Sequence, residues 1–408
     1  MDKAVSSIPR VSLITMVMGL GLLVFGGLLG ISMLWQGQGI GLLRVLLPYT
    51  DSHWFIMVYG FFLALIGNEI LVVLSMEWSG RPAILDLQLF FLIMLASSIT
   101  LRILGLHYLS YVLTALAFLP LVFHVKTTYL KSSILGLKPT LYNYLILTTL
   151  IITVGVILYA AYGSLNGVTV YVPIMSLVFP VGTILAILVR DLSLITGVRV
   201  SVPGYYHVLM YSLVIIGVLS MPTLAYTQYS IIPASLIIMG SIMAILGSGL
   251  LRAKTSRPLS IIELYTAFSW LMASGTLIIT AQLTNKPWDY VDAFIHSITL
   301  GFLFNVIFGV DVILTDWLLA YGGRGGAVTV RVGRSMRRSI PKALILPYML
   351  LNLGVALRVI YDIALIPWAG ALTGVLSGLG ILAFLGYNMG RVVINQAPWL
   401  KLSKLERP

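Results

Sequence analysis

The chain has no cysteine and very little charge. The absence of cysteine excludes disulfide bonds, thiolate nucleophiles, iron–sulfur clusters and cysteine-ligated zinc, so any metal would depend on His, Met, Tyr or carboxylate ligands. Charged residues make up 9% of the 408 positions and hydrophobic residues 59%, with a mean hydropathy of +1.02. A water-soluble domain cannot carry this composition on its surface, and no polar stretch is long enough to form one. We therefore expect a single membrane domain over residues 1–408, with the lipid bilayer as its solvent.

Acidic residues are scarcer than basic ones, at 13 against 25, which gives a net charge of +12. In a membrane chain this excess sets the orientation and does not indicate a nucleic-acid partner. Lys3 and Arg10 precede an apolar run that lacks a small-residue cleavage site, which predicts a retained first span and not a signal peptide.

Long apolar runs predict an all-α, polytopic bundle of about twelve spanning helices, because about 20 helical residues cross a hydrocarbon core about 30 Å thick. The short break at 105–108 predicts a tight hairpin between the third and fourth helices. The spans are expected near residues 11–34, 53–76, 84–105, 108–129, 142–163, 169–190, 203–224, 229–251, 261–283, 292–318, 340–361 and 366–390.

The basic residues predict the orientation of these spans. Only Arg44 and Lys286 fall in odd-numbered loops, and Arg102 and Arg358 fall inside spans; all other Lys and Arg lie in the tails and the even-numbered loops. Basic loops stay in the cytoplasm, so both termini are expected there, in a multi-pass protein of the cytoplasmic (plasma) membrane. The longest cytoplasmic connection is a basic, Gly-rich loop at 320–340. It lacks the Lys-Ser/Thr of a P-loop, which favours a solvated loop over a phosphate site.

Ionisable residues inside the spans form two tiers. Each costs about 2.5–3.5 kcal/mol to insert, so they are expected to face the bundle interior. The outer tier can ligate haem or copper through imidazole, with guanidinium groups pairing haem propionates. For each histidine, a helix-end residue bonded to backbone or water is the alternative. The outer tier comprises His53, His107, His296, Arg102 and Arg358, and the inner tier, a predicted proton or cation route, comprises Glu69, Asp311 and Glu263.

The second and tenth helices resemble each other. Each has an outer His, then a Gly-Phe pair (Gly60-Phe61 and Gly301-Phe302), a second Gly and an inner acid. Gly60 and Gly301 would let a helix or a flat macrocycle approach closely. The likeness suggests an internal duplication.

Several short motifs occur in a fixed order along the chain. The segment from His53 to Gly60-Phe61, closing with Trp78-Ser79-Gly80-Arg81-Pro82, and the later His296-Ser297-Ile298-Thr299-Leu300-Gly301 resemble motifs of the NnrS family, membrane proteins described as binding haem and copper and associated with the nitric-oxide response. Shorter elements similar to family motifs lie at Ala117-Phe118-Leu119-Pro120, Tyr265 to Leu271 and Ala356-Leu357-Arg358-Val359.

The resemblance implies a divergent member that binds haem, of b type, through His53 and His296. By their depth in the outer tier, Arg102 and Arg358 are the expected partners of the propionates, and His107 is a further candidate metal ligand. Copper is disfavoured, because the chain has Phe55 and Glu263 where family members have His, and Trp317 and Leu318 where they have Leu-Gly-His-Thr-Gly-Arg. A gaseous ligand such as NO and respiratory or other redox subunits are the implied partners. Two other functions stay open, a proton-coupled secondary transporter and a cofactor-free membrane anchor of a respiratory complex; whether the chain is an enzyme is left undecided.

Overall fold

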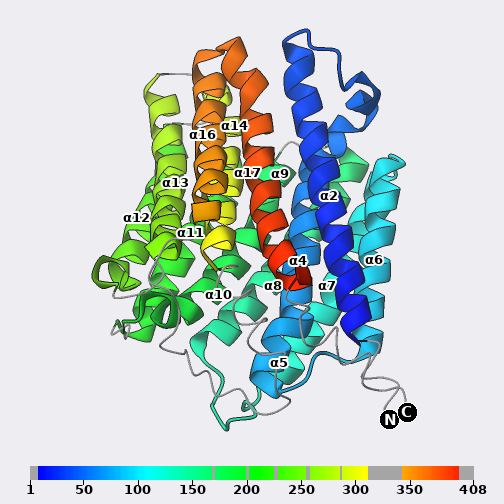
Figure 1. Cartoon of the computed structure of the whole chain (residues 1–408), viewed down its shortest axis with the longest axis vertical. Helices are drawn as coiled ribbons and strands as arrows, with labels where there is room; N and C mark the ends of the chain where they lie inside the picture. The colour runs from blue at the N-terminus through cyan, green and yellow to red at the C-terminus, as the bar shows by residue number, and fades with distance from the viewer. Residues whose placement is uncertain are drawn as a thin grey trace. The chain divides into compact units, whose positions relative to one another are not determined.

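A computed structural model of the chain describes residues 8–167, 171–198, 202–224, 228–253, 258–284, 287–310 and 342–394. All regular structure in these ranges is helical (Figure 1). Contacts cluster into two compact units within what the sequence predicts as one membrane domain. The first unit comprises Met1–Ile187 and Ile215–Thr227, and the second comprises Leu188–Val214 and Gln228–Pro408.

The first unit is built on helical hairpins. Helix α6 packs against α7, and α7 against α8, while α2 packs along the segment that begins at His53. Gly105, with φ +77°, makes the turn between α6 and α7, which confirms the predicted tight hairpin. The elements are α2 (Ile8–Gly37), η1 (Arg44–Ser52), α3 (His53–Phe55), η2 (Ile56–Phe62), α4 (Leu63–Asn68), η3 (Glu69–Val73), α5 (Leu74–Ser79), α6 (Leu85–Ile103), α7 (His107–His124), η4 (Val125–Tyr129), α8 (Leu141–Asn166), α9 (Val172–Ser176), and parts of α10 (Val178–Thr196) and α11 (Gly204–Leu224).

The second unit contains the other parts of α10 and α11 and a further set of hairpins. Helix α16 packs along α17, α12 along α13, and α14 contacts both α13 and α16. The helix that begins with α14 and η7 continues to residue 310. The elements are η5 (Gln228–Ser230), α12 (Ile231–Gly247), η6 (Leu250–Arg252), α13 (Pro258–Leu283), α14 (Pro287–His296), η7 (Ser297–Leu303), α16 (Lys342–Ala364) and α17 (Pro367–Ile394).

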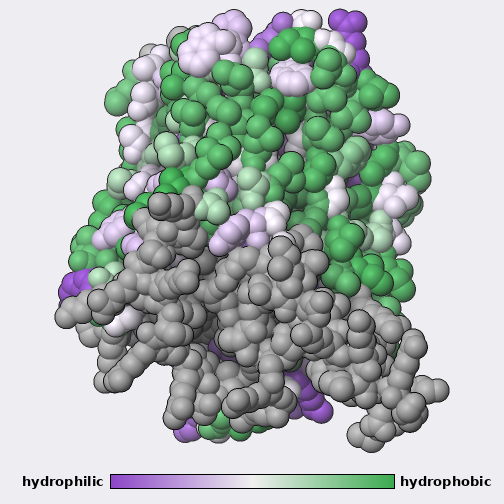
Figure 2. All heavy atoms as spheres, viewed as in Figure 1, coloured by the Kyte–Doolittle hydropathy of each residue, from purple (hydrophilic) through white to green (hydrophobic). Residues whose placement is uncertain are grey.

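The helices are long and apolar enough for a multi-pass membrane protein. In the described ranges, 11 helices meet this standard, and Val172–Leu188 is a shorter apolar helix at the predicted sixth span. Large apolar side chains point outward along them: Ile14 is 54% exposed and Ile151 is 55% exposed. Figure 2 shows such side chains over much of the visible described surface. Exposed apolar area of this extent indicates lipid contact, so the all-helical class and the bilayer environment are as predicted.

Four segments, η2, η3, η4 and η7, are π-helical. A π-helical turn widens the i→i+4 ladder and changes which backbone carbonyls are free to accept other donors. In η7 the Asn305 side-chain amide donates to the Gly301 carbonyl at 2.7 Å, and in η3 the Tyr129 hydroxyl donates to the Ile70 carbonyl. Segment η7 directly follows His296, and η2 begins three residues after His53 in the same helix. Because π-helical turns are frequent at functional sites, η2 and η7 are candidate locations for a functional site.

Candidate functional site

A cluster of four charged or titratable side chains joins α14 to α16 in the second unit. Asp292 and His296 lie one turn apart on α14, and Arg358 and Asp362 lie one turn apart on α16. The Arg358 Nη2 group forms an ion pair with Asp292 Oδ2, and its Nε–H donates to Asp362 Oδ2 at 3.1 Å. One guanidinium therefore compensates two carboxylates on different helices.

The four side chains differ in exposure. The Asp362 and Arg358 side chains are 5% and 11% exposed, whereas that of Asp292 is 47% exposed. The Arg358–Asp362 pair is thus the buried part of the cluster, and Asp292 is its rim. A buried ion pair of this kind is held by mutual attraction that offsets the cost of removing both charges from water.

His296 is oriented by its own helix. Its Nδ1 lies 2.9 Å from the Asp292 carbonyl oxygen and 3.3 Å from Asp292 Oδ1. A carbonyl only accepts, so Nδ1 carries the hydrogen, and the lone pair of the neutral ring is on Nε2. Ligand atoms of Asp292, His296 and Asp362 lie within 4.8 Å of one another, a spacing that suits a metal ion. Arg358 already satisfies both carboxylates, however, so the cluster is a complete ion-pair network without one.

His53 in the first unit is held in a similar way. Its Nδ1–H donates to the Gly26 carbonyl of α2 at 2.7 Å. A Cβ at Gly30 would lie 2.8 Å from His53 Cε1, so glycine at that position lets α2 lie directly against the imidazole. As for His296, the hydrogen bond to a carbonyl leaves the lone pair of the neutral ring on Nε2.

Arg102, the penultimate residue of α6, lies beside the start of the same helical segment. Its Nη2 donates to the Asp51 carbonyl at 3.2 Å, and its Nη1 donates to the Tyr111 hydroxyl at 3.5 Å. Its Cζ lies 5.0 Å from the ring centroid of Phe55, 5.4 Å from that of Trp54 and 5.7 Å from that of Tyr111. Aromatic faces therefore surround this guanidinium.

The two glycines singled out in the sequence face neighbouring side chains. A Cβ at Gly60 would lie 3.2 Å from both Ile99 and Leu22, and one at Gly301 would lie 2.6 Å from Trp270. Of the two roles left open, close approach of helices is the one these contacts support.

The other predicted residues are distributed through the two units. His107 is exposed at the first position of α7, in the predicted hairpin. Glu69 is half-buried at the start of η3, and Glu263 is fully buried on α13, where Gly309 packs against its Cβ. Asp311 and the loop at 320–340 lie outside the described residues. The structure thus links His296 to Arg358 through Asp292 in the second unit, whereas in the first unit Arg102 contacts the sequence neighbours of His53 and the His53 ring contacts α2.

Sequence reasoning missed Asp292 and Asp362, although a signal was present. Asp292 precedes His296 by four residues, and Asp362 follows Arg358 by four. Residues at this spacing on a helix face each other, so each pair was a candidate ion pair once the helices were assigned. The aromatic residues around Arg102 carried no comparable signal, because Tyr111 comes from the next helix.

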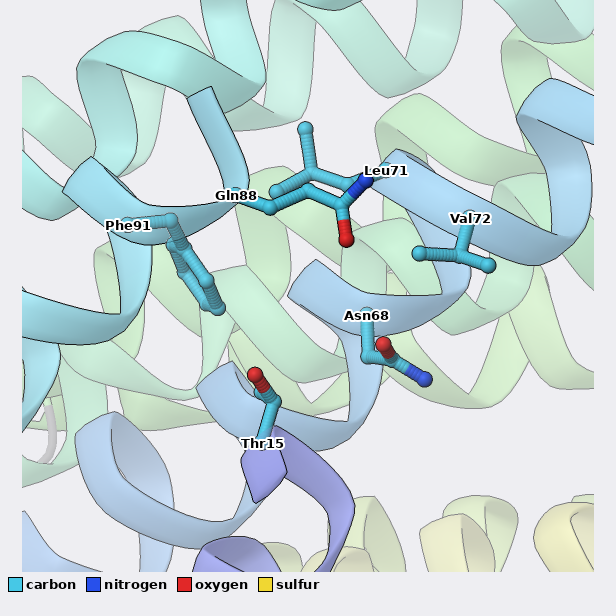
Figure 3. Close-up of a pocket in the computed structure, with 6 residues that line it drawn as sticks. All are labelled: Thr15, Asn68, Leu71, Val72, Gln88 and Phe91. Atoms are coloured by element: carbon cyan, nitrogen blue, oxygen red, sulfur yellow. The ribbon is translucent and has the colours of Figure 1, made fainter. Parts of the chain in front are cut away.

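A small pocket elsewhere in the first unit is too narrow to hold a ligand. Figure 3 shows side chains from α2, the His53 segment and α6 converging there, and it encloses no space for a water molecule. Ser12 donates to Asn68 Oδ1 at 2.7 Å, and Gln88 Nε2 donates to the Ala83 carbonyl at 2.7 Å. These contacts describe helix packing. The lining residues are Thr15, Asn68, Leu71, Val72, Gln88 and Phe91.

Comparison with models of known protein families and with curated proteins finds no match to this chain. The likeness to the NnrS family therefore rests on the sequence motifs alone and stays a prediction.

Proposed function

We propose that this chain is a haem-binding integral membrane protein of nitric-oxide or respiratory redox metabolism, with His53 in the first unit and His296 in the second as haem ligands. The observation that supports it is shared by both residues: each donates Nδ1–H to a backbone carbonyl and keeps the Nε2 lone pair. This is the orientation in which histidine ligates a metal through Nε2. Twelve spans, cytoplasmic termini and the plasma membrane are part of the same proposal.

The donor set fits haem at the imidazoles and differs between the two arginines. Arg358 is engaged by Asp292 and Asp362, so it is not offered to a propionate. Arg102 forms no ion pair with a carboxylate of the described chain and is the better anchor. Haem iron, when bound, supplies one-electron chemistry and affinity for diatomic gases. Within each unit, the chain's own backbone carbonyl orients the imidazole through its Nδ1.

Absorbance of detergent-purified protein tests the proposal. We expect the parent protein to show a Soret band. We expect His53→Ala and His296→Ala each to lose haem affinity by about tenfold or more, because loss of a residue that only hydrogen-bonds to a metal ligand already costs about 10–100-fold in metal affinity. His124→Gln is the matched control, since a glutamine side chain can keep a hydrogen bond to Ser75 Oγ, which lies 2.9 Å from His124 Nε2. A protein without a Soret band after expression with added haem would remove the proposal, as would a band unchanged in the double His53→Ala, His296→Ala variant.

A proton-coupled secondary transporter is the second candidate. It is favoured by Glu263, a fully buried acid on α13 next to Gly309, and by the interruption between α9 and α10 near Pro180. Intramembrane acids mark proton pathways, and discontinuous helices line transport sites. Proteoliposomes under an imposed pH gradient should then take up a solute in a manner lost in Glu263→Gln. Copurification of haem-free protein with redox subunits would instead support the anchor role.

A further inference from the structure

The two units place an arginine in the same setting but compensate its charge differently. In each unit an arginine contacts an aspartate residue that precedes one of the two histidines in the sequence. Arg102 on α6 donates to the backbone carbonyl of Asp51, two residues before His53, and Arg358 on α16 pairs with the carboxylate of Asp292, four residues before His296. Arg358 has two carboxylates, from Asp292 and Asp362. Four residues after Arg102 the chain has Leu106, where the second unit has Asp362.

Arg102 is buried, and no carboxylate of the described residues forms a close ion pair with it, although the Asp51 carboxylate attracts its charge at longer range. The Arg102 residue is only 7% exposed, and its Nε–H has no hydrogen-bond acceptor among the described residues. The nearby Asp51 is exposed and offers its backbone carbonyl, not its carboxylate, to the guanidinium. Aromatic faces lessen the burial cost of the charge but accept no conventional hydrogen bond. One strong, directional donor is therefore left for a group from outside the described chain.

We propose that Arg102 binds an anionic oxygen group, a carboxylate or a phosphate, at this end of the first unit. Guanidinium geometry suits both groups, and its hydrogen bonds to these anions are stronger than its hydrogen bonds to neutral acceptors. Arg102 lies close to the exposed end of its helix, because α6 ends one residue later and Leu104 to Leu106 are exposed. A lipid headgroup and a soluble anion share this chemistry. A haem propionate, for which the proposed function uses Arg102, is one such carboxylate, but the anion site itself rests on the contacts of Arg102 and is tested without haem.

Thermal unfolding of the full chain tests the site. The probes are inorganic phosphate against chloride at equal ionic strength in detergent, and phosphatidylglycerol against phosphatidylcholine in nanodiscs. Phosphate or phosphatidylglycerol should raise Tm by on the order of 5 °C, as expected for ligand well above its Kd. The rise should vanish in Arg102→Gln and persist in Arg44→Gln, which removes an exposed arginine of the same unit.

The outcomes separate the sources. A response to phosphatidylglycerol alone identifies a lipid headgroup, and a response to phosphate identifies a soluble anion. If Arg102→Gln does not fold, Arg102→Lys keeps the charge but loses the fork, and about tenfold more phosphate should be needed for the same Tm rise. The proposal is overturned if neither probe stabilises the parent protein, or if both variants at Arg102 respond as the parent does. Absorbance of the same samples reports haem, so loss of the anion response and loss of haem are read separately.

Discussion

Replacing Arg358 with methionine is expected to lower the free energy of unfolding of the second unit by about 3–5 kcal/mol, the usual effect of leaving a buried charge without its partner. Methionine keeps much of the side-chain volume, so the change isolates the charge. The substitution would leave the Asp362 carboxylate buried without its partner, since its side chain is 5% exposed and Arg358 Nε is its donor. Asp292 is 47% exposed and can be solvated instead. Thermal or SDS-induced unfolding in detergent measures the effect.

A second substitution tests whether the lost stability comes from the uncompensated carboxylate. The double variant Arg358→Met, Asp362→Leu removes both buried charges, and a buried ion pair replaced by apolar side chains is often neutral in stability. We therefore expect the double variant to recover most of the loss. Equal instability of the single and double variants would show that Arg358 matters through packing or through Asp292, and not through Asp362.

The helical class, the hairpin at Gly105 and the location of almost every long apolar helix of the described residues could be predicted from the sequence, because each depends on local composition. A run of about 20 apolar residues specifies a spanning helix regardless of its neighbours. The exceptions are local too. The segment around Pro180 divides into α9 and α10, and the helix that contains His53 includes π-helical turns, which apolar periodicity does not encode.

The candidate sites could be predicted only in part, because they depend on which helices pack together. His296 and Arg358 were assigned to one depth from the sequence, and the structure links them through Asp292. Depth alone did not show that Arg358 is occupied by the chain's own carboxylates while Arg102 is not. That difference follows from the contact of α14 with α16 and from the aromatic residues that reach Arg102 from α3 and α7.

The closest helix packing in the second unit predicts a large effect of a single methyl group. A Cβ at Gly354 on α16 would meet the Ser377 side chain, and would lie 2.7 Å from the Ser377 backbone nitrogen and 2.9 Å from the Thr373 carbonyl oxygen on α17. The Thr373 hydroxyl also donates to the Gly354 carbonyl at 2.6 Å. Backbone atoms cannot give way as a flexible side chain can. Gly354→Ala is therefore expected to lower the free energy of unfolding by about 1–3 kcal/mol.

Gly378 on α17 is the matched control for this substitution. A Cβ there meets nothing within 4 Å, so Gly378→Ala changes only the backbone entropy of a helical residue. Alanine is favoured over glycine in a helix by about 0.5–1 kcal/mol, so this variant should be slightly more stable than the parent protein. The two substitutions are chemically identical and should shift the unfolding midpoint in opposite directions. A shift of the same sign in both would mean that α16 and α17 do not pack through Gly354 in the membrane protein as purified.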